Sequence, residues 1–441
     1  MRGKGPVARR DFLKGVAVVA AAPYVITSSA LGAGGQAPAS ERIVMGCIGV
    51  GGQGSGDMSR FLSYGDVQVV AACDVDAARR DAARNAVERH YAAAGAAGTY
   101  KGCSAHTDFR EVIAREDIDA VCIAAPDHWH ALMSIAAAQA GKDVFCEKPL
   151  SLTVADGRAM VSAVRRFERV LQTGTQRRSS EVHRRICELV RNGRIGKLHT
   201  VEVSLPQGHW VVGSPPSQGN VPLAVPPGLD YDMWLGPAPW APYTPMRCHF
   251  NFRWIYDYSG GFMTDWGAHY NDLGQWGSDN DSTGPVEIDG RGVFPPDGLF
   301  DTATSFRVEY KYANGVRLIC ETKSPTGVRF IGTEGCVGFA DDAQGVFSDP
   351  PSVWTSVIGP REIHLYKAND HHGNFLDCVR TRKDPSASVD VGHRSASMCH
   401  LGNISMWLGR KLQWDPVAER FVNDAGADRL LSRALRSPWR L

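Results

Sequence analysis

Several features are missing from this 441-residue chain, and each absence excludes a class of function. A formal net charge of only +1 gives no excess positive charge to attract nucleic acid or an anionic membrane surface. The eleven cysteines include no Cys-x-x-Cys pair, so neither a zinc ribbon nor a thioredoxin-type redox site is predicted, and no metal site is expected. With 43% hydrophobic and 22% charged residues, the composition fits a soluble protein with two separate cores.

The region before residue 41 has the parts of an export signal. Paired arginines begin the segment Arg9-Arg10-Asp11-Phe12-Leu13-Lys14, an apolar run too short for a good membrane span continues to Ile26, and small residues suited to a signal peptidase follow at 28–33. This order predicts a twin-arginine signal and linker over residues 1–40. We therefore expect a periplasmic or otherwise exported protein, folded with its cofactor before export, and no membrane contact beyond export.

The first segment after this signal has the pattern of a dinucleotide-binding unit. An apolar strand at 43–48 leads into Gly49-Val-Gly-Gly-Gln-Gly54, and a helix and a second strand, 67–73, follow. Asp74 ends that strand, where its carboxylate would bind ribose hydroxyls and repel a 2′-phosphate. The pattern predicts NAD rather than NADP, although Arg79 and Arg80 lie nearby. The predicted cofactor contacts here are Gly49, Gly51, Gly52, Gln53, Gly54 and Asp74.

Strands and helices alternate as far as residue 172, which predicts an α/β Rossmann domain over residues 41–172. Cysteines at 47, 73, 122 and 146 fall within the expected strands and are interpreted as small core residues. The segment Pro126-Asp-His-Trp-His130 follows the strand 120–124 at its carboxyl end, where open α/β sheets bind ligands. Pro126 and His130 are predicted to contact the cofactor, and His128 and Trp129 the substrate. The alternatives are ordinary helix-start residues or, less favoured, a pair of metal ligands.

A lysine follows the next strand in a position that fold-building does not require. The strand 144–146 ends abruptly in Glu147-Lys148-Pro149, again at the carboxyl edge of the sheet. Taken alone, Lys148 would be an ordinary solvated loop residue. Beside the glycine loop it becomes a candidate for proton transfer or electrostatic catalysis, with Glu147 and Lys148 also predicted to contact the cofactor.

The pattern changes after residue 173. β-like runs at 198–205, 305–312, 316–322 and 328–331 are separated by long loops rich in proline and glycine. This predicts a second, α+β domain over residues 173–415 with a large, mostly antiparallel, open-faced sheet, followed by a tail at 416–441. The stretch 206–254 contains many prolines and tryptophans, and a loop of this length is usually functional or an interaction arm.

A second cluster of chemically capable residues lies at 259–272. If a helix follows Gly261, then Asp265, His269 and Asp272 share one helical face. An acid four residues before a histidine can fix its tautomer and stabilise its protonated form, as a general acid or base requires. A purely structural Asp-His pair on a helix turn remains an equal alternative on spacing alone.

Together these motifs resemble a known family. The glycine loop 49–54, Glu147-Lys148-Pro149, and Gly260-Gly261 followed by Asp265 and His269 are similar to the glucose-fructose oxidoreductase, inositol dehydrogenase and rhizopine-catabolism family, in its exported subgroup. The resemblance covers about residues 42–415. It implies NAD(P)-dependent chemistry on sugars or polyols, a cis Lys148–Pro149 bond, oligomerisation through the open sheet, and a segment near 371–410 that packs back on the first domain.

The resulting hypothesis is hydride transfer between a sugar, glycoside or polyol carbon and a tightly held nicotinamide. In this hypothesis His269 exchanges the hydroxyl proton, Asp265 orients it, and Lys148 binds the same oxygen. Two alternatives stay open: a redox-neutral, NAD-dependent glycoside hydrolase that oxidises its sugar transiently, and a catalytically silent sugar-binding protein. The predicted sugar contacts are His128, Trp129, Arg178, Arg253, Trp254 and Asp272.

Overall fold

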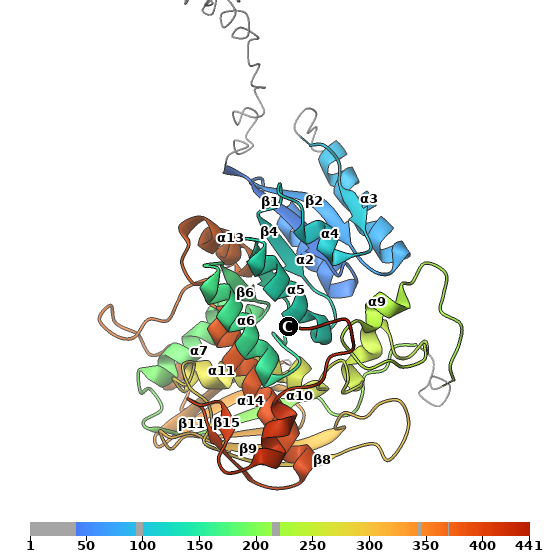
Figure 1. Ribbon diagram of the computed structural model, residues 1–441. Helices are drawn as coiled ribbons and strands as arrows, with labels where there is room; N and C mark the ends of the chain where they lie inside the picture. Colours follow the sequence, from blue (N-terminus) through green and yellow to red (C-terminus); the bar gives the residue numbers. More distant parts are fainter. Residues whose placement is uncertain (1–40, 94–99, 214–220, 342–344, 369) are drawn as a thin grey trace, which may run out of the picture.

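The structure is a computed structural model that describes residues 41–93, 100–213, 221–341, 345–368 and 370–441. The predicted export signal lies outside these residues. Two sheets organise the chain, with the first domain and its parallel sheet above a second, larger sheet in the view of Figure 1. Within the described ranges, no helix is long and apolar enough to cross a membrane.

The first sheet has six parallel strands in the order β3-β2-β1-β4-β5-β6. Its strands are almost entirely buried, which explains their continuous apolar sequences. The Rossmann prediction is confirmed, and only the short strand β3 was missed, because its three residues carry no apolar pattern. The strands are β1 (Ile43–Ile48), β2 (Val67–Cys73), β3 (Ser104–His106), β4 (Ala120–Ile123), β5 (Asp143–Cys146) and β6 (Leu171–Thr173).

Helices cover both faces of this sheet and make two separate cores. One face packs on α4, α5 and α6, and the other on α2, α3 and α13, so a helix from far along the chain completes the first domain. All eleven cysteines lie in the described ranges, buried and unpaired. The helices are α2 (Gly52–Leu62), α3 (Ala77–Ala93), α4 (Phe109–Ile113), α5 (Asp127–Gln139), α6 (Val154–Arg166) and α13 (His371–Thr381).

The second sheet has nine strands in the order β13-β12-β11-β7-β10-β9-β8-β14-β15. Every pairing is antiparallel except that of β7 with β10, so the expected mostly antiparallel sheet is confirmed. Five strands were not predicted, because glycines and charges interrupt their alternation. The strands are β7 (Leu198–Leu205), β8 (Glu287–Val293), β9 (Ser305–Lys311), β10 (Arg317–Thr322), β11 (Gly327–Gly332), β12 (Gly335–Ala340), β13 (Gly345–Asp349), β14 (Leu412–Asp415) and β15 (Arg420–Phe421).

The two faces of this sheet differ in chemistry. Helices α11 (Gly267–Gly277) and α14 (Val389–Leu408) pack on the inner face, and α14 also packs on α6 of the first domain. The outer face carries cross-strand ion pairs, including Arg317 with Glu309 at 2.8 Å and Arg307 with Glu321 at 3.1 Å. Opposite charges across neighbouring strands stabilise this outer face.

The expected helix after Gly261 is interrupted. Helix α10 (Phe262–Asp265) ends just before Trp266, and α11 begins at Gly267. At the junction, the backbone N–H of His269 donates to the carbonyl of Trp266 rather than to that of Asp265, so the turn is tighter than α-helical. Trp266 therefore interrupts the single regular helix that was assumed when Asp265, His269 and Asp272 were predicted to share one face.

The remaining segments join the domains. Residues 206–213 and 221–254, called the arm below, contain α9 (Tyr231–Leu235) and a 3₁₀ helix at His249–Trp254. Short elements at α7 (Glu181–Arg191), α12 (Ser352–Thr355) and α15 (Ala425–Asp428) complete the second domain. The last residues return to the first domain, and Figure 1 shows the end of the chain between α5 and α9.

Candidate functional site

A cavity of about 330 Å³ lies where the parallel strands end. The loops after β1, β2, β3, β4 and β5 form one wall, which is the ligand-binding edge of an open α/β sheet. The arm and the end of α10 form the opposite wall. The lining from the second domain consists of Met233, Trp234, His249, Phe250, Phe252, Arg253 and Asp265.

The glycine loop leaves room for a phosphate group. Gly49 has φ +77°, a conformation that residues with side chains rarely adopt. A Cβ on Gly54 would lie 1.9 Å from the carbonyl oxygen of Gly49, and one on Gly51 would lie 2.4 Å from the Arg79 guanidinium. Because the loop opens α2, its free backbone N–H groups suit an anion. The predicted contacts Gly49, Gly51, Gly52 and Gln53 line the cavity, while Gly54 supports the turn behind them.

Asp74 is placed to bind a ribose. Its Oδ2 accepts a hydrogen bond from Val50 N at 3.0 Å, and its Oδ1 accepts one from Asp76 N at 3.0 Å. Each carboxylate oxygen keeps a further lone pair for a hydroxyl. Arg79 approaches Asp76 at 3.7 Å, whereas Arg80 turns away and donates to Thr107 at 2.6 Å. The residues around the cavity therefore fit a dinucleotide.

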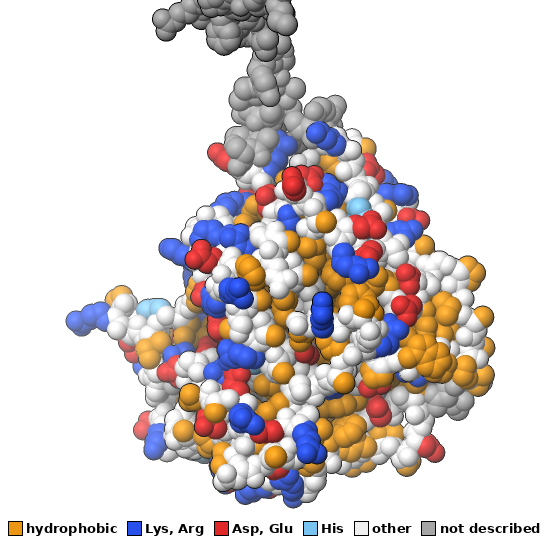
Figure 2. Space-filling view, viewed as in Figure 1, with side chains coloured by type: hydrophobic (Ala, Val, Ile, Leu, Met, Phe, Trp, Pro, Cys, Tyr) orange, Lys and Arg blue, Asp and Glu red, His pale blue; other side chains and the backbone are white. Residues whose placement is uncertain are grey.

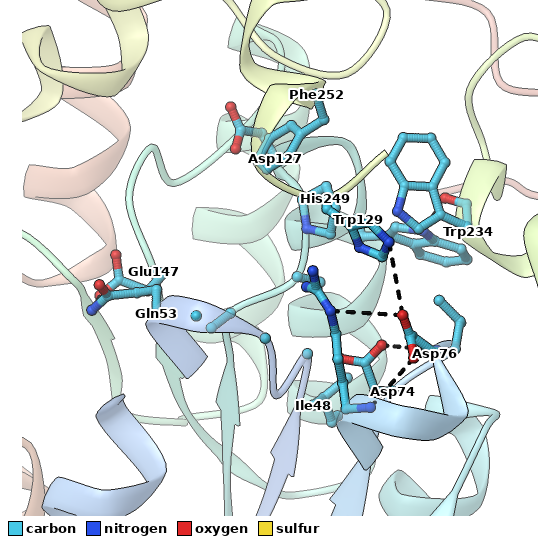
Figure 3. A pocket seen from close by; sticks show the side chains of 18 of the residues that line it. Ile48, Gln53, Asp74, Asp76, Asp127, Trp129, Glu147, Trp234, His249 and Phe252 are labelled. Carbon is cyan, nitrogen blue, oxygen red and sulfur yellow. Dashed lines mark hydrogen bonds and ion pairs between the residues drawn. The ribbon is translucent and has the colours of Figure 1, made fainter. Parts of the chain in front are cut away.

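Glu147 and Gln53 meet at the other side of the cavity, as Figure 3 shows. Gln53 Nε2 lies 3.4 Å from Glu147 Oε1 and 3.1 Å from Asp57 Oδ1. Burial, and then the charge of Asp57, raise the pKa of Glu147 to about 8. Glu147 also accepts from the backbone N–H of Lys148 at 3.1 Å, so it shapes the turn that presents the lysine.

Lys148 and Asp265 form an ion pair across the two domains. Lys148 Nζ lies 2.5 Å from Asp265 Oδ1, Arg253 Nε lies 3.6 Å from the same oxygen, and all three residues line the cavity. Burial alone would raise the pKa of the Asp265 carboxyl, but Lys148 and Arg253 outweigh it and lower the pKa. The Lys148–Pro149 peptide bond is cis. The structure thus brings together two of the three predicted catalytic residues, and also the predicted sugar contact Arg253.

His269 lies just outside the cavity lining. Its Nδ1 is buried and has no hydrogen-bond partner among the described residues, and within those residues Asp265 bonds Lys148 instead of the histidine. Burial, then the positive charges of Lys148 and Arg177, lower the pKa of His269 well below 6.5. The predicted hydrogen bond between Asp265 and His269 is absent among the described residues, although the charge of Asp265 still acts to raise the pKa of His269 against the other causes. A neutral imidazole remains that can accept a proton.

Pro126 lines the cavity as predicted, but His130 lies behind it. His130 is 1% exposed, and its two ring nitrogens face carbonyl oxygens, Nδ1 that of Pro149 and Nε2 that of Ala125, each at 2.8 Å. Two such contacts require an N–H on both nitrogens. Although burial lowers its pKa, Cys146 and Asp127 raise it to about 10. The predicted cofactor contact is corrected: His130 fastens the turn after β5 to the end of β4.

The aromatic sugar contacts are also revised. His128 is 5% exposed and faces the carbonyl of Trp234 at 3.0 Å, away from the cavity lining. Trp254 is fully buried, with its ring stacked on His209. Trp129 does line the cavity, but Figure 3 places it near His249 and Asp76 rather than near Glu147. His128 and Trp254 are therefore core residues. The sequence around them does not show that they are buried.

Arg178 and Asp272 are not available to a sugar. They form a two-pronged ion pair at 2.7 and 2.8 Å, with side chains that are 2% and 1% exposed. Asp281 and Ser395 complete the cluster, and the Arg178 guanidinium lies 5.1 Å from the Trp276 ring. The predicted substrate contacts are corrected, because burial and mutual pairing leave no free donor. Instead, the pair fixes α11 to the segment that follows β6.

The sequence reasoning missed much of the cavity lining, including Asp127, His249 and Phe252. Asp127 is 5% exposed and accepts from the Ser259 hydroxyl at 2.6 Å, linking α5 to the Gly260-Gly261 turn. Its position after β4 was a usable signal. His249 and Phe252 come from the arm, and no local pattern could have placed them opposite β2.

Comparison with known proteins bears on both domains. Residues 43–175 match the model for the "Oxidoreductase family, NAD-binding Rossmann fold", and residues 180–441 match that for the "Oxidoreductase family, C-terminal alpha/beta domain". Both models carry the family label Gfo/Idh/MocA. Together they account for most of the described chain.

Individual relatives match over shorter stretches. Myo-inositol 2-dehydrogenase of Thermotoga maritima is 33% identical over 160 residues, 36% of this chain and 44% of that protein. Glycosyl hydrolase family 109 protein 1 of Shewanella sp. (strain ANA-3) is 31% identical over 162 residues, 37% and 34% of the two chains. The aligned stretches thus span less than half the length of these relatives.

Solved structures resemble the whole fold. The WlbA dehydrogenase of Bordetella pertussis, in complex with NADH and UDP-GlcNAcA, has a TM-score of 0.62 at 16% identity, over 85% of this chain and 99% of that one. A levoglucosan dehydrogenase complexed with NADH and L-sorbose has a TM-score of 0.59 at 19% identity, over 85% and 99%. At these identities the likeness shows a shared fold.

Proposed function

Because the chain belongs to the Gfo/Idh/MocA oxidoreductase family, we propose that it catalyses NAD-dependent oxidation or reduction at a hydroxyl-bearing carbon of a sugar, glycoside or polyol. The observation that carries the proposal is the Lys148–Asp265 ion pair, which lines the same cavity as the glycine loop. Named relatives support the substrate class, since they include an inositol dehydrogenase and a 1,5-anhydro-D-fructose reductase.

In this proposal each residue beside the cavity has a separate chemical role. Lys148 Nζ donates a hydrogen bond to the substrate oxygen, and Asp265 holds the lysine there. Neutral His269 takes the hydroxyl proton at a ring nitrogen as the carbon–hydrogen bond breaks, and returns it in the reverse direction. A bound nicotinamide supplies the acceptor for the hydride. Arg253, beside Asp265, offers a planar donor to a second substrate oxygen.

The cofactor we propose is NAD. A 2′-phosphate on the ribose would meet the carboxylate of Asp74, and Asp76 lies in the same part of the cavity. Arg79 is the nearest basic group that would favour NADP, but it is turned toward Gly51 and Asp76. This placement suits a pyrophosphate better than a ribose phosphate.

A second candidate is a redox-neutral glycoside hydrolase. The similarity to glycosyl hydrolase family 109 proteins favours it. The same lysine and histidine would serve. Transient oxidation to a carbonyl would make the neighbouring carbon–hydrogen bond acidic, so that the aglycone could be eliminated; water would then add to the double bond, and the hydride would return to the carbonyl. We rank it second because the pair Lys148–Asp265 is already suited to simple oxidation.

Export is proposed on the twin-arginine pattern at Arg9-Arg10 alone. Since free nicotinamide nucleotides are scarce outside the cytoplasm, an exported enzyme of this kind needs a cofactor that stays bound. A homo-oligomer through the outer face of the nine-stranded sheet is proposed from family resemblance, and the ion pairs of that face would make such an interface polar.

Product analysis tests the proposal. The purified protein, loaded with NAD, is incubated with a panel of pyranosides, glycosides and polyols, and products are identified by mass spectrometry. We expect a keto product in amounts equal to the reduced nucleotide formed. Released aglycone without net reduction would favour the hydrolase instead. A protein that binds the sugars but changes none of them, with or without nucleotide, would contradict both.

A further inference from the structure

Two tryptophans lie next to the proposed catalytic residues, outside the lining of the dinucleotide cavity. Trp266 follows Asp265 directly in the chain, and its ring meets the His269 ring edge-on, with 6.3 Å between centroids. The Trp210 ring meets the Trp266 ring in the same way at 5.7 Å. Neither tryptophan lines the cavity. An aromatic surface, made of the rings of Trp210 and Trp266, therefore begins beside His269 and extends away from it.

Trp210 is exposed, yet its position is fixed. Its side chain is 47% exposed, while its ring packs edge-on against Phe262 at 5.0 Å. Its carbonyl accepts from the indole N–H of Trp254 at 3.1 Å. The buried Asn251 amide holds the backbone of Val212, accepting from its N–H at 2.9 Å and donating to its carbonyl at 2.7 Å. A large ring held in this way can bind a ligand at a low cost in conformational entropy.

Exposure alone does not distinguish Trp210 from other side chains of the arm. Figure 2 shows hydrophobic side chains gathered on the side of the molecule where α9 lies. Four further apolar side chains of the arm are between 42% and 70% exposed, at Val221, Leu223, Val225 and Trp240. Trp210 differs because its ring contacts Trp266, the residue next to Asp265.

Polar groups border the aromatic surface. The Tyr270 ring is stacked on that of Trp266 at 6.4 Å, and the Arg177 guanidinium lies 4.3 Å from the Tyr270 ring. Arg177 also pairs with the Asp341 carboxylate at 2.6 Å, and both side chains are partly exposed. A sugar ring has apolar carbon–hydrogen faces and a rim of hydroxyls. Aromatic rings with a planar donor and a carboxylate beside them suit both parts of a sugar.

We propose that Trp210 and Trp266 form a subsite for a second ring of the substrate, joined by a glycosidic bond to the sugar ring that reacts. The preferred substrates are then glycosides with a ring-bearing aglycone or a second sugar unit, rather than free monosaccharides or polyols. The inference rests on the proposed function, because it takes the reacting oxygen to lie between Lys148 and His269. A ring held there lies beside Trp266, and a substituent that passes Trp266 reaches Trp210.

The test compares paired ligands on the full-length protein loaded with NADH, which cannot accept a hydride, so that binding is measured without turnover. Methyl and phenyl glycosides of glucose, galactose, mannose and xylose, in both anomers, are titrated by isothermal titration calorimetry. For at least one sugar we expect the phenyl glycoside to bind about tenfold more tightly than the methyl glycoside, because the added ring stacks on the aromatic surface.

Disaccharides that carry the same sugar, linked in the same anomeric form, make a second arm of the test. A comparable gain over the methyl glycoside identifies the second ring as a sugar unit. A gain with the phenyl glycoside alone identifies it as an aromatic aglycone.

Substitutions at Trp210 connect the gain to the aromatic surface. We expect Trp210→Ala to lower the phenyl-to-methyl affinity ratio by about fivefold or more, because one stacking ring is lost. The hydrogen bond from Trp254 remains, since the backbone carbonyl accepts it. Trp210→Leu keeps apolar packing on Phe262 but has no aromatic face, and should lower the ratio similarly. Trp240→Ala, at a 70% exposed tryptophan of the same arm, is the matched control and should leave the ratio unchanged.

Equal affinities for the phenyl and methyl glycosides of every sugar would overturn the subsite. A ratio that Trp210→Ala and Trp210→Leu both leave unchanged, in variants with unchanged thermal midpoints, would also overturn it. Should Trp210→Ala not fold, the Trp210→Leu ratio decides. Absence of binding by every glycoside would likewise overturn the subsite. In each of these cases, formation of a keto product from any sugar or polyol would still support the proposed function.

Discussion

Lys148 is distinguished by its surroundings rather than by its own sequence context. It is only 15% exposed, it follows a buried strand, and its nearest carboxylate belongs to the other domain. A side chain that pairs across a domain boundary inside a cavity is unusual for a loop lysine. Its position between the nucleotide loop and the second domain is what makes it a catalytic candidate.

Replacing Lys148 with alanine should separate binding from chemistry. We expect Lys148→Ala to bind NADH about as tightly as the unchanged protein, but to lose about 10²-fold or more in single-turnover hydride transfer, because one donor to the substrate oxygen is gone. Fluorescence titration and single-turnover absorbance measure the two properties. Lys101→Ala, at an exposed lysine, is the control. Undiminished hydride transfer would remove Lys148 from the mechanism.

His269 should act as a base over an unusually wide pH range. Its pKa lies well below 6.5, so the neutral form persists as the pH falls through 6.5. We therefore expect kcat/KM for sugar oxidation to show no loss from this group between about pH 8 and 6.5, and His269→Ala to lose about 10²-fold or more. A fall centred near pH 6.5 that disappears in His269→Ala would contradict this assignment.

The sequence alone identified the glycine loop, Asp74, Lys148 and Asp265 as cavity residues. Each of them either follows a predicted strand at the carboxyl edge of the sheet or lies within a recognisable local motif. The same reasoning failed for Arg178, Asp272, His128 and Trp254. Each is polar or aromatic and lies near a motif, yet each is buried against a partner distant in sequence. Pairing over such distances is not a local property, so only the folded chain shows it.

At the scale of elements, the Arg178–Asp272 pair holds α11, and therefore His269, against the segment after β6. Both side chains are almost fully buried, so the contribution of each to the free energy of unfolding depends on the presence of the other. A buried pair of this kind need not stabilise the fold overall, but removing one partner leaves an uncompensated charge. The pair thus positions α11 without contacting substrate.

Removing one partner of the Arg178–Asp272 pair should lower the free energy of unfolding. Arg178→Met leaves Asp272 buried without its cation, and we expect a loss of about 3–5 kcal/mol in the free energy of unfolding. The double change Arg178→Met with Asp272→Leu should recover part of it. Urea unfolding measures both. Arg380→Ala, at a half-exposed ion pair with Asp66, is the control and should cost about 1 kcal/mol or less. Equal losses for Arg178→Met and Arg380→Ala would contradict the positioning role.

The break between α10 and α11 shows why helix spacing misled. Counting from Asp265 to His269 assumes one regular helix, but Trp266 belongs to neither α10 nor α11, and Asp265 pairs with Lys148 instead of the histidine. The glycines at 260 and 261 permit the sharp entry, and no residue in the sequence marks the break itself. The order of the elements was predictable, whereas the interruption at Trp266 and the pairing of Asp265 with Lys148 were not.

At the scale of the whole molecule, buried histidines should govern the acid side of stability. Burial lowers the pKa of His128 and His183 from 6.5 to about 4, and that of His371 and His400 to about 3. All four are neutral when folded and take up protons on unfolding. Their contribution is complete above pH 6.5 and is lost as the pH falls toward 3.

We therefore expect the thermal midpoint to fall steadily between pH 6.5 and about 4. His400→Gln keeps a donor to the carbonyl of Ser151 but cannot titrate, so its midpoint should depend less steeply on pH. Differential scanning fluorimetry across this range measures both. A midpoint that rises on acidification would show that these histidines are already protonated in the folded protein.

The two domains, their order and the parallel sheet could all be predicted, because buried strands and helical spacing leave clear local patterns. The contacts of the arm and of residues 436–439 could not be predicted. These segments pack on the loop after β2 and on Trp129, and loops rich in proline carry no periodic signal for such contacts. The cavity is therefore a property of the assembled chain.

The central claim is that the cavity holds a dinucleotide whose reactive end meets Lys148 and His269. The most direct measurement is a single-turnover experiment in which the unchanged protein, loaded with NAD, is mixed with sugars and polyols while absorbance in the reduced-nicotinamide band is followed. The account predicts a rise with at least one of them, and a much slower rise with Lys148→Ala. A protein that binds no nicotinamide nucleotide, or a bound nucleotide that every sugar and polyol leaves unchanged, would contradict it.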